Sequence, residues 1–256
     1  MTLCIMGMGL RGADSLTLLE VERLRRADEV LLDTYTSFIP PGTVERIREL
    51  TGKEVRLCGR TELEEHGWLI EMSRNRLVCL LVPGDALSAT THNQVRMSAV
   101  RAGVDVEVLE NASILNTWHG RLGLLSYKVG PPVSMPFTDE RFFPLSVADK
   151  VRRNLENGLH TLLLLDLDRN RENLDPHTAL RTLLAMAQRR NYDNPNEGTM
   201  ACVLSGLGQP WEKVVCGKIS DLLQTEIGFR SPVSIAILAS LDFSEEEMLS
   251  AFCQSV

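Results

Sequence analysis

A glycine-rich turn near the start of the sequence could hold a phosphate group. Residues 3–24 contain Gly7, Gly9 and Gly12 in the spacing G-x-G-x-x-G, after an apolar strand-like run and before a helical pattern. In this context the pyrophosphate of a dinucleotide meets a helix N-terminus. Asp33 ends the next predicted strand, about 20 residues after the last glycine, where a ribose-binding carboxylate is expected. The pattern makes an NAD-dependent oxidoreductase one candidate.

The position of the following helix argues against that candidate. In a dinucleotide turn the helix begins within the glycines, whereas here the helix cap is expected at Ser15 to Thr17, beyond Gly12. The carboxylate of Asp14 would also occupy the place of the phosphate. A strand-to-helix turn that simply requires glycine explains the segment better.

A second candidate site lies in the segment LVPGDALSATTHNQV at 81–95. Pro83, Gly84 and Asp85 predict a tight turn at the carboxyl end of the fourth strand, where ligands bind in open α/β sheets. Asp85 would be an unpaired acid there, suited to hydrogen-bonding or balancing a cationic ligand. Taken alone, the residues fit an ordinary Gly-Asp turn in which Thr90 or Thr91 caps the next helix.

Short apolar runs alternate with amphipathic stretches through the first half of the chain. Thr17 and Glu20 form a predicted capping box for a helix whose apolar face contains Leu18, Val21 and Leu24. Further predicted helices cover 43–50, 61–73 and 91–103, and predicted strands cover 3–6, 29–33, 54–58, 76–82 and 104–109. This alternation predicts an open α/β sheet. The continuous apolar run at 76–82 is typical of a parallel strand covered on both faces.

The pattern changes after about residue 120. The segment at 124–137 contains prolines at 131, 132 and 136, which favour extended chain with a turn over a buried parallel strand. Mixed helices and strands follow, with antiparallel strands expected, and Ser244 with Glu247 predicts a capping box for the last helix. We therefore expect an N-terminal α/β domain over 1–120 and a C-terminal mixed α/β domain over 121–256.

Composition narrows the classes of function. The chain has 256 residues and a formal net charge of −7, which gives no support to binding of a nucleic-acid backbone. Its six cysteines form no C-x-x-C pair, so we expect buried free thiols in a reducing cytosol and neither a metal site nor a disulfide. With no basic leader and no long apolar run, the sequence predicts a cytoplasmic protein without a membrane anchor.

Several uncommon segments occur in an order and spacing that one family shares. They are MGLRGADSLTLL, TYTS at 34–37, GDALSATTH, NASILN, GLLSYKVGPPVSMPF and GLHTLLLLDL, spread from residue 6 to about 167, with a weaker match in LDFSEEEML. Together they resemble the diphthine synthase family, methyltransferases of the tetrapyrrole-methylase fold, and the compact length resembles its archaeal branch. The resemblance implies two mixed α/β domains with a cofactor cleft between them. It also implies that the glycine turn lines a site for S-adenosylmethionine, which carries no phosphate.

The resemblance assigns contacts with S-adenosylmethionine by position in the sequence. These are Leu10, Asp85, Ser88, Ser113 and Ile114 in the first domain, and Leu164, Leu207 and Val233 in the second. Without the resemblance, the aliphatic members of this set would be taken as core residues.

Four polar residues are candidates to face the substrate. Tyr35, Thr36 and Ser37 follow a strand end and could orient an incoming side chain or simply form a polar loop. His92 could take part in catalysis, or could cap or pack its own helix. The sequence identifies no catalytic residue and predicts no metal.

Three positions depart from the family pattern. Ala86 replaces the usual proline after Gly-Asp, Val233 stands where a histidine commonly contacts the cofactor, and Asp242 stands where a segment usually ends in histidine. A pocket formed mainly by main-chain atoms remains plausible with these changes. The changes call into question the side-chain contacts with the cofactor that are predicted for the second domain. They also leave open a protein that binds its ligand without catalysing a reaction.

The resemblance implies a reaction and its partners. The donor would be S-adenosylmethionine and its product S-adenosylhomocysteine. The acceptor would be the amino group of a modified histidine, the diphthamide precursor, on translation elongation factor 2, giving diphthine after three transfers. A homodimer is expected, with no nucleic acid or membrane as partner. Alternatives are another methyltransferase of the same fold acting on a tetrapyrrole or on ribosomal RNA.

Overall fold

The computed structural model describes residues 1–168, 172–226 and 228–255. It divides the chain into two compact units, Met1–Ile114 and Leu115–Val256. Residues 115–120, expected in the first domain, fall in the second unit. No helix within the described ranges is long and apolar enough to span a membrane.

The first unit is an open sheet of five parallel strands, in the order β3-β2-β4-β1-β5. The strands are β1 (Thr2–Gly7), β2 (Glu29–Asp33), β3 (Val55–Cys58), β4 (Val78–Val82) and β5 (Asp105–Leu109). The helices are α1 (Leu18–Arg26), α2 (Thr43–Thr51), α3 (Arg60–Glu64), α4 (Gly67–Ser73) and α5 (His92–Arg101), with a short 3-10 helix η1 (Gly12–Ser15). The expected α/β sheet is confirmed.

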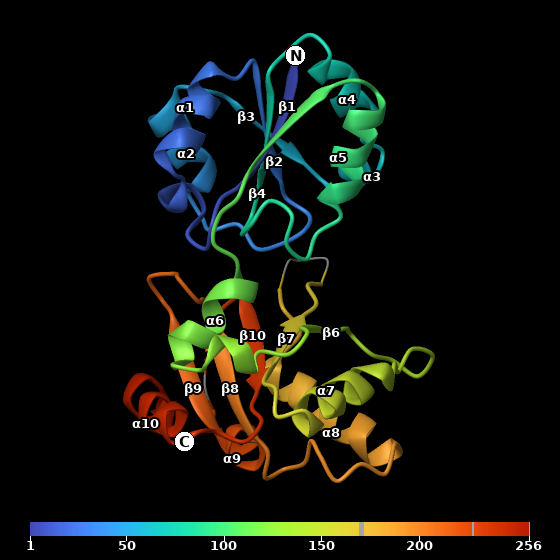
Figure 1. The fold of residues 1–256 in the computed structure, drawn as a ribbon, viewed down its shortest axis with the longest axis vertical. Helices are drawn as coiled ribbons and strands as arrows, with labels where there is room; N and C mark the ends of the chain where they lie inside the picture. The colour runs from blue at the N-terminus through green and yellow to red at the C-terminus, as the bar shows by residue number, and fades with distance from the viewer. Residues whose placement is uncertain (169–171, 227, 256) are drawn as a thin grey trace. The chain divides into compact units, whose positions relative to one another are not determined.

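Helices cover both faces of this sheet because its strands are apolar on both sides. Along β1, Leu3 and Ile5 pack in a cluster with residues of α4 and α5, whereas Cys4 and Met6 pack with residues of α1 and α2. Figure 1 shows the two helix layers on either side of the strands. This arrangement places the turns that follow β1, β2, β4 and β5 at one edge of the sheet.

Two local expectations for this unit are corrected. The capping box of Thr17 and Glu20 is present, but Leu18 is 91% exposed. Glu20 and Leu24 define the buried face of α1, and Leu18 lies on the opposite side because it is two residues, about 200° of helical rotation, from Glu20. The single helix expected over 61–73 is two helices, α3 and α4, separated by a turn before Gly67.

The second unit contains a six-stranded mixed sheet in the order β11-β9-β8-β10-β7-β6. Its strands are β6 (Val133–Met135), β7 (Thr161–Leu165), β8 (Met200–Ser205), β9 (Lys213–Lys218), β10 (Val233–Ile237) and β11 (Gln254–Ser255). Its helices are α7 (Ser146–Glu156), α8 (Pro176–Arg189), α9 (Ile219–Gln224) and α10 (Phe243–Phe252), with η2 (Ser126–Lys128). Helix α6 (Ile114–Leu122) begins at the division between the units.

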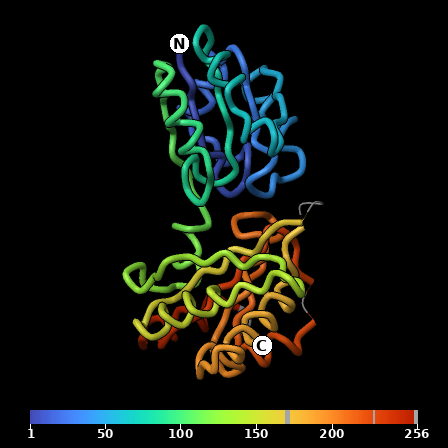
Figure 2. Tube along the Cα trace, turned by 90° about the vertical axis from the view of Figure 1, so that its right-hand side faces the viewer, coloured from blue at the N-terminus to red at the C-terminus, as the bar shows by residue number. Residues whose placement is uncertain are grey.

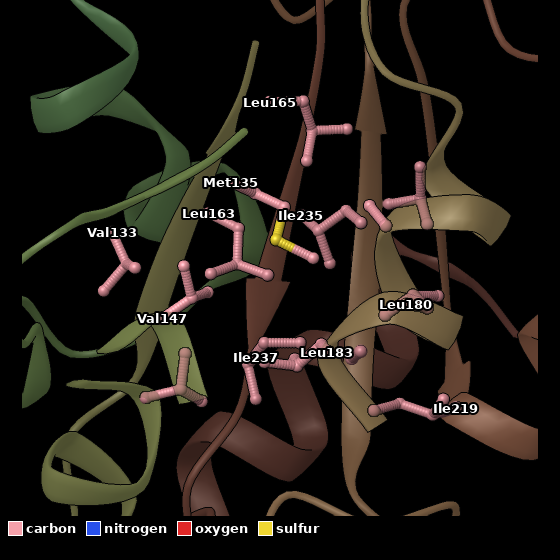
Figure 3. Packing of buried hydrophobic residues seen from close by; sticks show 14 of the residues in the cluster. Val133, Met135, Val147, Leu163, Leu165, Leu180, Leu183, Ile219, Ile235 and Ile237 are labelled. Carbon is pink, nitrogen blue, oxygen red and sulfur yellow. The ribbon is translucent and has the colours of Figure 1, made fainter. Parts of the chain in front are cut away.

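One large apolar cluster holds this unit together. Alternate residues of the strands, such as Leu163, Ile235 and Ile237, pack against Val147 of α7 and Leu183 of α8 (Figure 3). Helices α7 and α8 contact each other over this face of the sheet (Figures 1 and 2).

The segment at 124–137 differs from its prediction. Val133 and Met135 belong to β6, which pairs in parallel with β7, and both side chains are buried in the apolar cluster. Pro131 and Pro132 precede the strand, and β6 is an edge strand of the sheet, so no proline interrupts its single ladder. The prolines therefore set where the strand begins without preventing it.

Two further expectations for this unit are wrong. Helix α10 is capped by Asp242 with Glu245, two residues before the expected Ser244 and Glu247. Cys202 and Cys216 form a disulfide, because they lie directly opposite on the antiparallel strands β8 and β9 with Cα atoms 4.1 Å apart. The remaining cysteines, Cys4, Cys58, Cys79 and Cys253, are free thiols.

Candidate functional site

The glycine turn after β1 and the Pro-Gly-Asp turn after β4 form one structure. The backbone amide of Gly9 donates to the carbonyl of Gly84 at 2.9 Å, and the amide of Gly84 donates back at 3.1 Å. Gly7 permits this approach, since a Cβ on it would lie 2.6 Å from the carbonyl oxygen of Gly84. Gly7 is thus required by the close contact between the two turns.

The side chain of Asn111 links these turns to the end of β5. Its amide nitrogen donates to the carbonyls of Gly7 at 3.2 Å and Ser15 at 3.0 Å, and contacts the Glu20 carboxylate at 3.2 Å. Its backbone amide donates to Asp85 Oδ2 at 3.1 Å. Asn111 lies within the family segment NASILN, but the sequence alone predicts no role for it, because its hydrogen-bond partners are distant along the chain.

Asp85 is not the unpaired acid that the sequence suggested. Its carboxylate accepts from the amide of Leu87 at 3.1 Å, from the hydroxyl of Ser88 at 2.7 Å and from the amide of Asn111. Burial disfavours its charged form, but these hydrogen bonds outweigh burial and hold the pKa of Asp85 below its ordinary value. Asp85 and Ser88 therefore fix the shape of the turn.

Asp33 and His92 form a buried polar pair beneath the neighbouring turns. Asp33 accepts from the amides of Tyr35 at 2.6 Å and Thr36 at 3.1 Å, and from the hydroxyl of Thr36. Nε2 of His92 lies 3.4 Å from Asp33 Oδ2, and Nδ1 contacts the hydroxyl of Thr90. Burial lowers the pKa of His92, although the charge of Asp33 opposes this effect. The pair connects the segment after β2 to the segment before α5.

This geometry changes the interpretation of both residues. Asp33 is fully buried and hydrogen-bonded to its own turn, so it does not present a carboxylate to a ribose. His92 is 1% exposed, so its side chain does not face an incoming substrate. Its side chain contacts Thr90 directly and Asp33, which in turn accepts from Thr36.

The other predicted residues of the first unit lie in the same turns. Leu10 is partly buried directly after Gly9, and Ser113 is buried after β5, next to Ile114 at the start of α6. Tyr35 packs against the core, with the Arg60 guanidinium 5.3 Å from its ring centre. Ser37 is partly buried.

Two carboxylates at this edge of the sheet have no lysine or arginine partner among the described residues. Within the described part of the chain, neither Asp33 nor Asp85 forms an ion pair with lysine or arginine, whereas Asp14 pairs with Arg46 at 3.1 Å. Asp33 instead contacts His92, and a carboxylate without a lysine or arginine partner attracts a sulfonium or ammonium group and repels a diphosphate. Among the residues that the structure describes, no group of three or more His, Cys, Asp or Glu side chains could hold a metal ion.

The three predicted contacts of the second unit meet at one end of its sheet. Leu164 on β7 pairs with Ser234 on β10, and Val233 pairs with Ser205 at the end of β8, just before Leu207. The amide of Gly206 donates to the carbonyl of Pro232 at 2.7 Å. Strands from three separate parts of the sequence thus bring the backbones of these residues to one end of the sheet, where Val233 faces the apolar cluster and Leu164 the opposite side.

The side chain of Asn173 links two strands at this end of the sheet by hydrogen bonds to their backbones, as Asn111 links turns in the first unit. Its amide nitrogen donates to the carbonyl of Leu165 at 3.0 Å, and its Oδ1 accepts from the amide of Val233 at 2.8 Å. Val233 itself is buried in the apolar cluster, which explains why an aliphatic residue suits this position. Asn173 carried no recognisable signal in the sequence.

Asp242 has a structural role. It caps α10, and one of its oxygens lies 3.3 Å from Nζ of Lys128. The neighbouring Glu245 is buried and accepts from Lys128 at 2.6 Å, from the amide of Leu125 at 2.9 Å and from His160 at 3.1 Å. Burial alone would raise the pKa of Glu245, but these partners hold it at about 2. The cluster secures α10 to the segment after α6.

Comparisons with known proteins agree over nearly the whole chain. The family described as tetrapyrrole (corrin/porphyrin) methylases matches residues 2–223. A diphthine synthase of Thermoplasma acidophilum is 44% identical over 252 residues, covering 98% of this chain and 96% of the relative. A diphthine synthase of Methanocaldococcus jannaschii is 32% identical, covering 99% and 100%. A crystal structure of diphthine synthase superposes with a TM-score of 0.88 at 29% identity, covering 100% and 97%.

Proposed function

This chain belongs to the tetrapyrrole (corrin/porphyrin) methylase family and to the diphthine synthases within it, and we propose that it performs their reaction on translation elongation factor 2. It is an S-adenosylmethionine-dependent methyltransferase of diphthamide biosynthesis. The acceptor in this proposal is the amino group of the modified histidine, and the final product is diphthine. The observation that carries the proposal is 44% identity across 98% of the chain to a diphthine synthase.

The residues present fit S-adenosylmethionine as the donor. A Cβ on Gly84 would meet no atom within 4 Å, so the backbone of this turn has open space beside it. The nearby carboxylates of Asp33 and Asp85 lack lysine or arginine partners among the described residues, which suits a positively charged ligand. The proposed donor set is Leu10, Asp85, Ser88, Ser113 and Ile114 in the first unit, with Leu164, Leu207 and Val233 in the second.

The protein residues in this proposal chiefly bind and orient. When bound, S-adenosylmethionine supplies a methyl group already activated by its sulfonium. Asp85 and Asn111 keep the turns after β1, β4 and β5 in one shape, while Asn173 does the same at the end of β7. A pre-formed site lowers the entropic cost of aligning an amine nitrogen with the methyl carbon, which is the main barrier in such a transfer.

The finer properties of the protein are part of the proposal. We expect elongation factor 2 to be its protein substrate, a homodimer to be its assembly, and the cytoplasm to be its location. The half-buried Tyr35, Thr36 and Ser37 remain candidates to contact the acceptor.

One assay tests the reaction directly. Purified protein is incubated with labelled S-adenosylmethionine and with elongation factor 2 that carries the unmethylated arm. Label is expected on that factor alone, and none on the same factor without the arm, on a tetrapyrrole or on ribosomal RNA. Transfer to either of the last two acceptors, or binding of S-adenosylhomocysteine without transfer to the factor, would refute the proposal.

A further inference from the structure

Asp166 combines a fixed backbone with an unengaged side chain. Its amide donates to the carbonyl of Met135 on β6 at 3.1 Å, and its carbonyl accepts from the amide of Leu174 at 2.8 Å. Its carboxylate is exposed and forms neither a hydrogen bond nor an ion pair with any residue that the structure describes. The chain therefore holds this acid in place without using it for structure.

Three other acids near the proposed donor-binding turns are engaged. Asp14 pairs with Arg46, and the carboxylates of Asp33 and Asp85 accept hydrogen bonds from their own turns. Glu110 is also exposed, but it follows β5, an edge strand of the other sheet, whereas Asp105 at the amino end of β5 is an exposed acid outside these turns. Asp166 follows β7, an interior strand that is paired on both sides.

Strand geometry places Asp166 beside the proposed donor contact Leu164. Leu163 and Leu165 face the apolar cluster, so Leu164 and Asp166 lie on the opposite face of β7. Residues two apart on one strand are about 7 Å apart along it. Leu164 is flanked on that face by Ser134 and Ser234, which pair with it and are at least partly exposed. A ligand against Leu164 would therefore lie close to the carboxylate of Asp166.

Methyl transfer creates positive charge where a carboxylate is useful. The carbon–sulfur bond breaks, its electron pair stays on sulfur, and the lone pair of a neutral amine forms the new carbon–nitrogen bond. One unit of positive charge thereby moves from sulfur to nitrogen, and the nitrogen loses a proton to solvent before it accepts another methyl group. A fixed negative charge beside the nitrogen is worth more in the transition state than in the ground state.

We propose that the carboxylate of Asp166 stabilises the charge developing on the acceptor nitrogen and binds the quaternary ammonium of the product. This inference rests on the proposed function. The desolvation that raises the pKa of Asp166 is consistent with a carboxylate that lacks its counter-ion, and a bound cation would reverse that shift.

The test compares Asp166→Asn with Asp105→Asn. For Asp166→Asn we expect kcat for methyl transfer to fall about 10- to 100-fold, with KM for the acceptor and affinity for S-adenosylhomocysteine within about twofold of wild type. Calorimetry should show affinity for the fully methylated factor falling about tenfold, while affinity for the factor without the arm stays unchanged. Asp166→Glu should recover part of both losses, and Asp105→Asn should behave like wild type.

Each alternative outcome has a distinct meaning. A wild-type kcat in Asp166→Asn, an equal loss in Asp105→Asn, or a parallel loss of affinity for S-adenosylhomocysteine would overturn the role of Asp166. The thermal midpoint of Asp166→Asn should match wild type, since the carboxylate has no partner within the described residues; a lower midpoint would indicate a structural role instead. Failure of wild-type protein to methylate the factor would refute the proposed function itself, before any variant is compared.

Discussion

At the scale of single residues, the polar side chains of the first unit hold turns together across long stretches of sequence. Asn111 and Gly7, which share a hydrogen bond, are 104 positions apart. Asp85 looked like a free acid in the sequence because the donors that occupy it come from its own turn and from the end of β5. A residue type and its neighbours along the chain indicated a site here, but could not reveal which atoms remain available to a ligand.

Replacing Asn111 with alanine should loosen all three turns at once. The carbonyls of Gly7 and Ser15 would each lose a donor, which should lower the free energy of unfolding by about 2 kcal/mol. Affinity for S-adenosylhomocysteine, measured by calorimetry, should fall at least about tenfold, equivalent to about 1.4 kcal/mol. Asn157→Ala, at the exposed end of α7, is the matched control and should change neither quantity. Unchanged affinity in Asn111→Ala would show that the turns keep their shape without this amide.

At the scale of elements, α10 is secured by buried charge. The carboxylate of Glu245 accepts hydrogen bonds from Lys128, His160 and two backbone amides. Its pKa of about 2 shows how strongly the folded protein favours the ionised form. A carboxyl whose pKa is lowered on folding stabilises the protein above its unfolded pKa and loses this effect as the pH falls. The helix should therefore be sensitive to acid.

Acid should destabilise α10 through Glu245. Between pH 6 and pH 3 this group should lose about 2 kcal/mol of stabilisation, because the unfolded carboxyl binds its proton well before the folded one does. Hydrogen exchange of the α10 amides, corrected for the intrinsic effect of pH, measures this change. Glu245→Gln should be less stable at pH 6 and should lose less protection on acidification; an identical pH dependence in both proteins would contradict the assignment.

The disulfide should stabilise the β8–β9 hairpin. For a closed loop of this size, reduction is expected to cost about 3 kcal/mol, seen as a lower thermal midpoint in dithiothreitol. The double variant Cys202→Ala with Cys216→Ala should lose the sensitivity to reductant, whereas Cys253→Ala should keep it. Titration of the denatured, unreduced protein should find four thiols, since Cys4, Cys58, Cys79 and Cys253 are free; six would show that the bond does not form.

Most elements followed from local pattern, and the exceptions have tertiary causes. The five parallel strands of the first unit were predictable because their apolar runs and intervening helices are regular. The capping box at Thr17 was predictable from the spacing of Thr17 and Glu20. The exposure of Leu18 was not, because it depends on Glu20 being on the buried face of α1. Strand β6 and the Cys202–Cys216 pair could not be predicted, since each depends on which distant strand lies alongside.

At the scale of the whole molecule, two units present different surfaces to a ligand. The first offers backbone atoms of tight turns above buried carboxylates, and the second offers the Leu164 face with the unengaged Asp166 at its end. The family segments identified in the sequence fall on these same places. The resemblance therefore proposes where the donor binds, while the hydrogen bonds show which of these side chains hold the turns in shape.

This charge distribution predicts a choice between two adenosine-containing ligands. S-adenosylhomocysteine carries an ammonium and no phosphate, and should bind with a Kd in the micromolar range typical of such ligands, roughly −8 kcal/mol. NADH would place a diphosphate beside Asp33 and Asp85, which have no lysine or arginine partner among the described residues, so no binding is expected at millimolar NADH. Adenosine, which shares the neutral part of both ligands, should bind weakly and so isolate the effect of the diphosphate. Calorimetry with the three ligands gives this order directly, and NADH binding tighter than adenosine would mean that the glycine turn does accept a pyrophosphate.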